Sequence, residues 1–262
     1  YLSRPESGTP FDITSASLDT SISSRDPNPQ GIAWNNDGSR FYEAGNDSQK
    51  IFQFSVSTPF DIASASLDTS ISTQDSDISG IAWNDDGSRL YEVGFDSNQI
   101  YQSTLSTPFD ISSASFDGYI NVQDSFPVGI ALNNDGSRLY ELGGGGNKIY
   151  QSILSTPFNI FSASFDTSIN TQDSHARGFA WNDDGSRLYE SGTGSDLIYQ
   201  SSLSTPFDIT TASLDTTINS QEQDPNDIAW NNDGSRFYQI DIVQDEIYQF
   251  QVVTPARWEE FA

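Results

Sequence analysis

The stretch "GIAWNDDGSRLYEVG" at residues 80–94 joins two apolar segments through the pair Asp86-Gly87. An Asp-Gly pair between apolar runs is a strong signal for a two-residue β-hairpin turn. Closely similar words recur every 49 residues, beginning at Gly31, Gly80, Gly129, Gly178 and Asp227. A fixed period of this size indicates a repeat architecture, so the period decides the fold.

Each period contains four segments with the character of strands. In the second copy they are residues 80–84, 88–94, 99–106 and 114–121, the first apolar and the last polar. No segment shows a helical period over ten residues. Four short strands per repeat is typical of a propeller blade, whose first strand lines the axis and whose fourth meets solvent. We predict an all-β, five-bladed β-propeller as a single domain over residues 1–262, with about 1–8 and 255–262 as terminal extensions.

The two ends of the chain predict how the ring closes. Residues 11–24 match a fourth strand that has no first three strands before it, and the last repeat supplies only three strands. We therefore predict a 3+1 closure in which residues 17–24 complete the last blade beside residues 246–253. Such pairing removes two open sheet edges, which would otherwise invite aggregation.

The repeat word "GIAWNDDGSRLYE" resembles the repeats of the YVTN/NHL-like propeller superfamily. Its companion "STPFDISSASFD", residues 106–117, is similar to a repeat of secreted bacterial proteins and marine phage tail or fibre proteins. The resemblance covers the chain except about its first and last eight residues. It implies the propeller fold and leaves the function open, because propellers host enzymes, lectins and passive scaffolds. No catalytic signature of the propeller lactonases or dehydrogenases maps onto these residues.

The composition is strongly acidic, with 37 Asp+Glu against 11 Lys+Arg and a net charge of -26. Such a field repels nucleic acid and anionic membranes, so we predict neither a nucleic-acid partner nor membrane insertion. The chain has no Cys, which excludes disulfides, thiolate zinc sites and cysteine nucleophiles.

Three sets of repeated polar and aromatic residues receive structural interpretations. Arg40 and its equivalents begin the second strand, and we expect each to pair with an adjacent blade or with the Asp of its own turn. Asp26 and its equivalents end the fourth strand, and we expect each to cap the following loop. Trp34 and its equivalents lie in the innermost strand and are expected to pack in the core or between blades.

The loops of the two faces differ in how far the copies have diverged. The bottom face, which carries the Asp-Gly turns and the Thr-Pro-Phe loops, is nearly identical in all five copies. The top face carries the loops after the second strand and before the first, and these loops differ in every copy. Two explanations stay open: the top face is adapted to an asymmetric ligand, or it is unconstrained surface.

If the top face binds a ligand, seven residues are candidates for the contact. The aromatics would supply apolar contact and the others polar contact; the set is Asp47, Phe95, Asp96, Phe126, His175, Arg177 and Asp196. His175 is the single histidine, so a zinc site is not expected, and nothing marks a nucleophile elbow or oxyanion hole. We predict no cofactor and no metal. A calcium ion at the Asp-Gly turns is the alternative, although these turns lack the remaining oxygen ligands of an EF-hand.

Two functions from different classes follow from these features. The first is an extracellular, non-catalytic binding module that recognises a glycan or another surface ligand through its top-face loops. The second is a structural subunit of a viral fibre, filament or other appendage, in which Trp258 and Phe261 of the tail dock on a neighbouring copy or partner. An enzyme ranks last, because the inner strands are too apolar and repetitive to build one asymmetric active site. Both leading functions place the protein outside the cell or on a virion surface.

Overall fold

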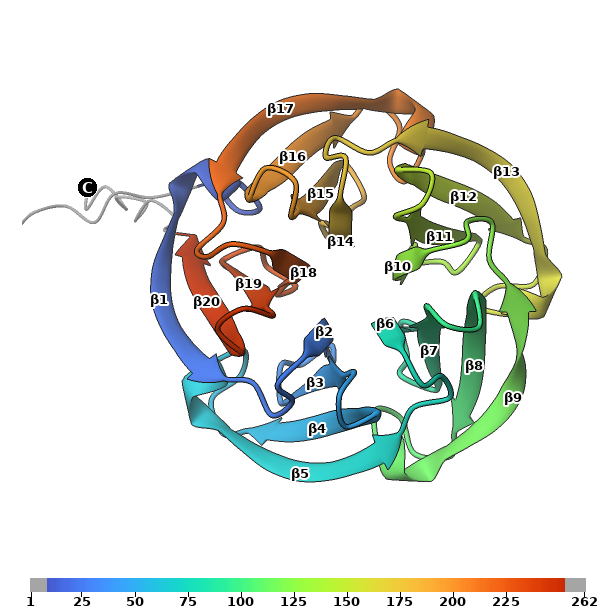
Figure 1. Ribbon diagram of the computed structural model, residues 1–262, viewed down its shortest axis with the longest axis horizontal. Helices are drawn as coiled ribbons and strands as arrows, with labels where there is room; N and C mark the ends of the chain where they lie inside the picture. Colours follow the sequence, from blue (N-terminus) through green and yellow to red (C-terminus); the bar gives the residue numbers. More distant parts are fainter. Residues whose placement is uncertain (1–8, 253–262) are drawn as a thin grey trace, which may run out of the picture.

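The computed structural model describes residues 9–252 as five four-stranded antiparallel sheets set around a central axis (Figure 1). The predicted all-β, five-bladed propeller is confirmed. Strands β2, β6, β10, β14 and β18 lie closest to the axis, and β5, β9, β13, β17 and β1 form the rim (Figure 1). The second strand is the most buried one in every blade, with five of its six residues buried, because it has a strand on either side and neighbouring blades cover its faces.

The first three blades follow the chain in order. Blade 1 consists of β2 (Pro29–Trp34), β3 (Arg40–Gly45), β4 (Lys50–Val56) and β5 (Ala65–Ser72). Blade 2 consists of β6 (Ile78–Trp83), β7 (Arg89–Gly94), β8 (Gln99–Leu105) and β9 (Ala114–Asn121). Blade 3 consists of β10 (Pro127–Leu132), β11 (Arg138–Gly143), β12 (Lys148–Leu154) and β13 (Ala163–Asn170).

Blade 4 consists of β14 (Ala176–Trp181), β15 (Arg187–Gly192), β16 (Leu197–Leu203) and β17 (Ala212–Asn219). Blade 5 consists of β18 (Pro225–Trp230), β19 (Arg236–Asp241), β20 (Glu246–Val252) and β1 (Ala16–Ser23). One short 3-10 helix precedes each rim strand; these are η1 (Ile13–Ser15), η2 (Ile62–Ser64), η3 (Ile111–Ser113), η4 (Ile160–Ser162) and η5 (Ile209–Thr211).

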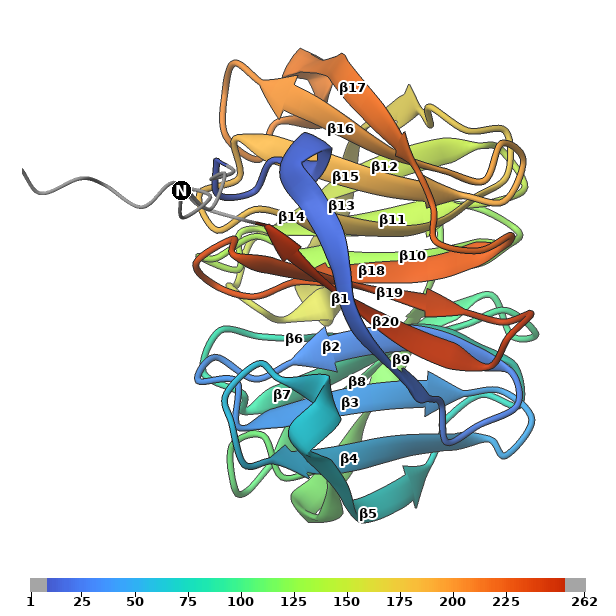
Figure 2. The same ribbon diagram turned by 90° about the vertical axis from the view of Figure 1, so that its left-hand side faces the viewer.

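Blade 5 combines strands from both ends of the chain. β1 pairs antiparallel with β20, in a register that runs from Ala16 opposite Val252 to Ser23 opposite Glu246. Figure 2 faces this blade and shows the blue β1 lying against the red β20. The terminal segments 1–8 and 253–262, with Trp258 and Phe261, lie outside the described residues.

The repeated Asp-Gly hairpin is held by its own side chains. Asp86 Oδ1 accepts from Asn84 Nδ2 at 2.8 Å and from the Ser88 backbone N–H at 2.9 Å. Gly87 has a φ of +68°, a backbone conformation that residues with a Cβ rarely adopt. The Ser88 hydroxyl, together with these two donors, holds the pKa of Asp86 below its ordinary value. The turn uses every one of these residues, which explains why the five copies share them.

The Thr-Pro-Phe loop packs against this turn from below. The Phe109 backbone N–H donates to the Gly87 carbonyl at 2.9 Å, and a Cβ at Gly87 would lie 2.3 Å from the Phe109 ring. Phe109 itself has a φ of +59°, which is strained for a bulky residue. The loop therefore needs strong contacts to hold its shape.

Those contacts come from the preceding blade. The Phe109 carbonyl accepts from Arg40 Nη1 at 2.9 Å and from the Tyr42 hydroxyl at 2.5 Å, both on β3 of blade 1. The same pair of bonds recurs at the other four junctions, on the carbonyls of Phe11, Phe60, Phe158 and Phe207. Of the two partners expected for the repeat arginines, the structure shows the adjacent blade. Because blade 5 contacts blade 1 in the same way, the junctions form a closed ring.

A buried glutamine makes a second bond at each junction. Gln53 on β4 accepts from the Ile111 backbone N–H of blade 2 at 3.0 Å and donates to Asp68 of its own blade at 2.7 Å. Asp68 is the extra residue of a β-bulge on β5, where the register shifts between Gln53 and Phe54. A bulge of this kind aims the Asp side chain back at the sheet.

The apolar core is divided into five layers that lie between blades. In one layer Phe41, Phe54 and Ile62 of blade 1 pack against Tyr238 and Ile247 of blade 5. The repeat tryptophans lie partly buried at these junctions, as expected, and Trp34 contacts Tyr238 with ring centroids 4.7 Å apart. No blade has a core of its own, so each blade is stable only between its neighbours.

The close contact between turn and loop gives a prediction for Gly87. We expect Gly87→Ala to lower the free energy of unfolding by about 2 kcal/mol or more, because it adds a Cβ at positive φ and against the Phe109 ring. Gly87→Asn is the matched variant, since Asn tolerates positive φ but carries the same Cβ. Urea unfolding should show both variants strongly destabilised, and wild-type stability of the Asn variant would contradict the contact with Phe109.

Candidate functional site

The loops of the top face are tied together by the Asp26 carboxylate and its equivalents. Asp26 accepts from the backbone N–H groups of Asn28 at 2.9 Å, Asp47 at 3.2 Å and Ser48 at 2.8 Å. It therefore joins the loop before the first strand to the loop after the second. This is the capping role expected for these carboxylates, and it places both divergent loops on one face.

Blade 5 reaches the same result with a different residue. Asp241 stands where the other blades have glycine, and its Oδ1 accepts from the N–H groups of Val243 at 2.8 Å and Gln244 at 2.9 Å. In blade 1 a Cβ at the equivalent Gly45 would lie 2.4 Å from Asp26. An Asp at the Asp26 position therefore leaves no room for a side chain at the glycine position. Blade 5 has the longer Glu222 at the Asp26 position, and Asp241 accepts the loop N–H groups in its place.

A β-bulge near the start of each innermost strand creates the top opening of the axis. The register of β2 against β3 skips from Pro29 to Gly31, and the other four blades show the same skip. One residue per blade therefore has no partner on the neighbouring strand. A β-bulge changes the direction of the side chain of such a residue. The five bulge residues are all different: Gln30, Ser79, Val128, Arg177 and Asn226.

Below the bulges the inner strands come into contact and close the floor of the opening. A Cβ at Gly31 would lie 3.2 Å from the Gly80 Cα, and one at Gly178 would lie 2.5 Å from the Asp227 Cα. Asp227 alone breaks the ring of glycines. Its carboxylate accepts from the Ile32 N–H at 3.0 Å and the Ile228 N–H at 2.9 Å, and burial raises its pKa to about 7.

Two adjoining cavities, each of about 220 Å³, occupy the top opening, and together we call them the top mouth. The axial cavity is lined by Gln30, Asp77, Ser79, Phe95, Val128, Arg177, Asn226 and Ile242. The lateral cavity is lined by Phe95, Phe126, Val128, Gly144, His175, Ala176 and Arg177. Phe95, Val128 and Arg177 belong to both, so they form the wall that the two cavities share.

Four of the seven candidate residues meet in the lateral cavity. Phe95 and Phe126 have ring centroids 5.2 Å apart at an interplanar angle of 34°. Phe126 is 48% exposed, and His175 is exposed beside it. Arg177 is half-buried, and its Nε is buried without a hydrogen-bond partner among residues 9–252.

The other three candidates line neither cavity and make contacts within the loops. Asp47 accepts from Asn28 Nδ2 at 3.3 Å, and Asp96 accepts from the Ser76 hydroxyl at 2.9 Å. Asp196 has a φ of +56° and accepts from the Asp224 N–H at 3.2 Å. The structure thus gives these carboxylates a place in loop support.

The candidates missed from the sequence are the other bulge residues and Asp77. Asn226 Nδ2 donates to Gln30 Oε1 at 2.9 Å and to the Gln30 carbonyl at 3.1 Å, and the Ser79 hydroxyl donates to the Pro127 carbonyl at 2.8 Å. These bonds cross between blades 5 and 1 and between blades 2 and 3. The sequence did contain a signal for the bulge residues. When the five repeats are aligned, the residue directly before Gly31 and its equivalents is different in every copy.

The opposite end of the axis has a larger cavity of about 320 Å³, built from repeated residues. Its lining includes Trp34, Trp83 and Leu132 from the inner strands. It also includes turn residues, and Asn36 Nδ2 donates to the Asp85 carbonyl of the next blade at 2.5 Å. The indole N–H groups of Trp34 and Trp83 are buried with no partner among the described residues. This bottom mouth is nearly five-fold symmetric, whereas the top mouth is not.

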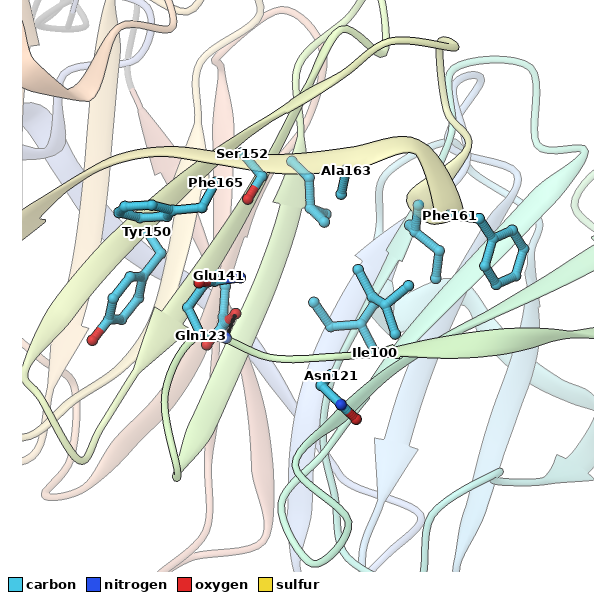
Figure 3. Close-up of a pocket in the computed structure, with 12 residues that line it drawn as sticks. Ile100, Asn121, Gln123, Glu141, Tyr150, Ser152, Phe161, Ala163 and Phe165 are labelled. Atoms are coloured by element: carbon cyan, nitrogen blue, oxygen red, sulfur yellow. Dashed lines mark hydrogen bonds between the residues drawn. The ribbon is translucent and has the colours of Figure 1, made fainter.

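A further cavity, of about 130 Å³, lies on the outer side between blades 2 and 3. Figure 3 shows Glu141 beside Gln123, with Tyr150 and Phe165 to one side and Phe161 at the far side. Glu141 accepts from the Gln123 N–H at 2.7 Å and the Asp124 N–H at 2.8 Å. The glutamate therefore holds the start of a top-face loop, and its burial raises its pKa to about 7.

Residues 9–252 contain neither a candidate metal site nor a candidate membrane-spanning helix. No group of three or more His, Asp or Glu side chains is close enough together to hold a metal ion. No helix in this range is long and apolar enough to cross a membrane.

No family model matches the chain, and no curated protein matches it. The Cps50 (Swd1) β-propeller domain of Myceliophteria thermophila is similar in structure at 9% identity, with a TM-score of 0.54 and coverage of 91% of this chain and 100% of that one. A putative 6-phosphogluconolactonase of Bacteroides fragilis is 14% identical, with a TM-score of 0.53 and coverage of 85% and 67%. The comparisons show a β-propeller.

A functionally unknown protein of Desulfotomaculum acetoxidans is also similar, at 14% identity and a TM-score of 0.51. The alignment covers 81% of this chain and 62% of that one, so this chain spans less than two thirds of that protein's length. At these identities the propeller likeness is a likeness of fold and carries no activity with it.

The buried glutamates predict how stability depends on pH. Burial raises the pKa values of Glu43, Glu92, Glu141 and Glu190 from 4.5 to about 7. Between these values the folded chain binds more protons than the unfolded one, so the free energy of unfolding should fall as pH rises from about 4.5 to 7.

Blade 5 supplies the matched variant, because Gln239 occupies the glutamate position and accepts from the Gln221 N–H at 3.1 Å. We expect the variant with all four glutamates changed to Gln to lose most of this pH dependence in urea unfolding measured from pH 4.5 to 8. Parallel profiles for wild type and variant would contradict the assignment.

Proposed function

We propose that the protein is a non-catalytic binding module that takes a saccharide ligand in the top mouth. The observation that carries the proposal is the asymmetry of this opening. Five bulge residues in equivalent positions are all different, while the frame that holds them repeats in every blade. A site for an asymmetric ligand needs unequal groups at fixed places, and this arrangement supplies them.

The lining suits a sugar better than a flat apolar ligand. The Phe95 and Phe126 rings offer apolar faces for sugar C–H groups, and Asn226, Gln30 and Ser79 bring amide and hydroxyl groups to the axial cavity that Phe95 also lines. These polar side chains are already fixed by bonds between blades, so little ordering is needed on binding. Small-molecule sites commonly combine apolar walls with a few fixed polar groups in this way.

The ionisable groups of the top mouth support binding without catalysis. They are Asp77, His175 and Arg177. His175 Nδ1 lies 3.1 Å from the Ser174 hydroxyl, but both side chains are exposed. No carboxylate among the described residues orients the His175 ring, as an activated nucleophile would require. We further propose that the module acts outside the cell or on a virion surface, where glycans are the available ligands.

The test replaces the two phenylalanines with residues that other blades carry at the same positions. Thr193 is equivalent to Phe95, and Asn28 is equivalent to Phe126. We expect Phe95→Thr with Phe126→Asn to fold normally and to weaken saccharide binding by about tenfold or more, since each ring supplies about 1 kcal/mol of contact. Binding is measured on a panel of immobilised glycans and then by calorimetry on the best ligand.

Two controls locate the site. Trp83→Leu removes an aromatic from the bottom mouth and has a natural equivalent in Leu132, and Tyr119→Ser removes a 53% exposed aromatic from the rim. Both should bind as wild type does. Loss of binding only in the Trp83 variant would show that the ligand binds in the bottom mouth and would contradict the proposed site. A chain that binds no glycan and self-associates in sedimentation would overturn the proposal in favour of a structural subunit.

A further inference from the structure

Arg177 is the one arginine or lysine among the residues that line the top mouth, on a chain whose net charge is -26. The equivalent bulge positions carry Gln, Ser, Val and Asn, so no requirement of the fold calls for a cation there. The five repeat arginines differ from Arg177, because the guanidinium of each donates a hydrogen bond to a carbonyl of the next blade. Arg177 therefore needs another explanation.

The surroundings of Arg177 within residues 9–252 leave one donor of its guanidinium without a hydrogen-bond partner. Its Nε is buried and has no hydrogen-bond partner in the part of the chain that the structure describes. A buried donor with no partner costs free energy, and the cost is greatest for a charged group. The lateral cavity beside it is lined mainly by apolar residues, together with His175; the apolar residues are Phe95, Phe126, Val128, Gly144 and Ala176.

Arg177 is half-buried and lines both cavities, so an anion in the top mouth would meet the accessible part of its guanidinium. A planar guanidinium binds a carboxylate through two parallel N–H···O bonds. Apolar walls strengthen such a pair by lowering the local dielectric. We propose that Arg177 binds the carboxylate of an acidic saccharide, a uronic acid residue, whose ring lies against Phe95 and Phe126. This inference rests on the proposed function and names its ligand class.

The other residues of the top mouth limit the ligand to one acidic group, which lies at Arg177. Asp77 lines the axial cavity, and its pKa is raised by burial and by the neighbouring Asp96 carboxylate. The Asp77 carboxylate disfavours a second anion in the axial cavity, whereas Asn226, Ser79 and Asp77 can form hydrogen bonds with hydroxyl groups. The geometry fits a uronate with its carboxylate toward Arg177 and its hydroxyls toward the axis. A densely charged polyanion would be repelled by the acidic surface.

The experiment compares matched probes on the full chain. The methyl glycoside of galacturonate, its methyl ester and the neutral methyl galactoside are titrated by calorimetry, together with the corresponding glucuronate and glucose series. We expect the uronate to bind at least about tenfold more tightly than its ester or neutral partner, with a difference that shrinks as salt is raised.

The decisive variant is Arg177→Gln, since Gln30 shows that this residue fits the bulge. It should lose the preference for uronate while keeping the thermal stability of wild type. Arg25→Gln removes the same charge from an exposed position outside the top mouth and should keep the preference. Arg177→Lys should keep part of it, because an ammonium group pairs with a carboxylate as a point charge.

The outcomes separate the two proposals. Saccharide binding with equal affinity for acidic and neutral probes, unchanged in Arg177→Gln, would overturn the role of Arg177 and leave the proposed function standing. Absence of any saccharide binding by the wild type would overturn both. A uronate preference lost equally in Arg25→Gln would show a general effect of charge and would also overturn the subsite.

Discussion

The backbone carbonyl of the loop phenylalanine is the interaction on which the rest of the structure depends. At each junction this oxygen accepts from an Arg guanidinium and a Tyr hydroxyl of the preceding blade, as Phe109 does from Arg40 and Tyr42. The phenylalanine can present it only at positive φ, and its ring at the same time fills the space below the Asp-Gly turn. One strained residue therefore couples a turn, a loop and two blades. The strain is offset because a charged donor and a buried phenol both satisfy the same oxygen.

This coupling lies on the bottom face and between the blades, so it leaves the top mouth free to vary. The bulge releases one residue per inner strand from the ladder, and the next residue, usually glycine, closes the floor beneath it. Blade 5 shows how far the top can change: Asp241 has taken over the capping of the loop after the second strand, and Asp227 has replaced the axial glycine. The frame tolerated both changes. A symmetric scaffold can in this way carry an asymmetric site.

Most of the fold could be predicted from the sequence because turn chemistry divides each repeat. The expected segment 88–94 is β7, Arg89–Gly94, and the expected segment 114–121 is β9, Ala114–Asn121. The partner of Arg40 could not be chosen in advance, since the choice depends on the distance between blades. Divergence of the loops selected seven candidate residues, of which Phe95, Phe126, His175 and Arg177 line one cavity of the top mouth. It missed Gln30 and Asn226, because only the bulge turns these side chains toward the axis.

The central claim is that the ring of junctions carries stability while the bulge residues form the binding site. It is tested most directly by making the top mouth symmetric: Gln30, Val128, Arg177 and Asn226 are all changed to Ser, the residue of blade 2. Each new serine can donate to the next blade's carbonyl, as Ser79 does to Pro127. Calorimetric titration of this chain with the saccharide that wild type binds best is the measurement, after thermal unfolding has shown a cooperative transition. The account predicts a folded propeller that no longer binds. Retained binding would contradict it, and so would a chain that fails to fold.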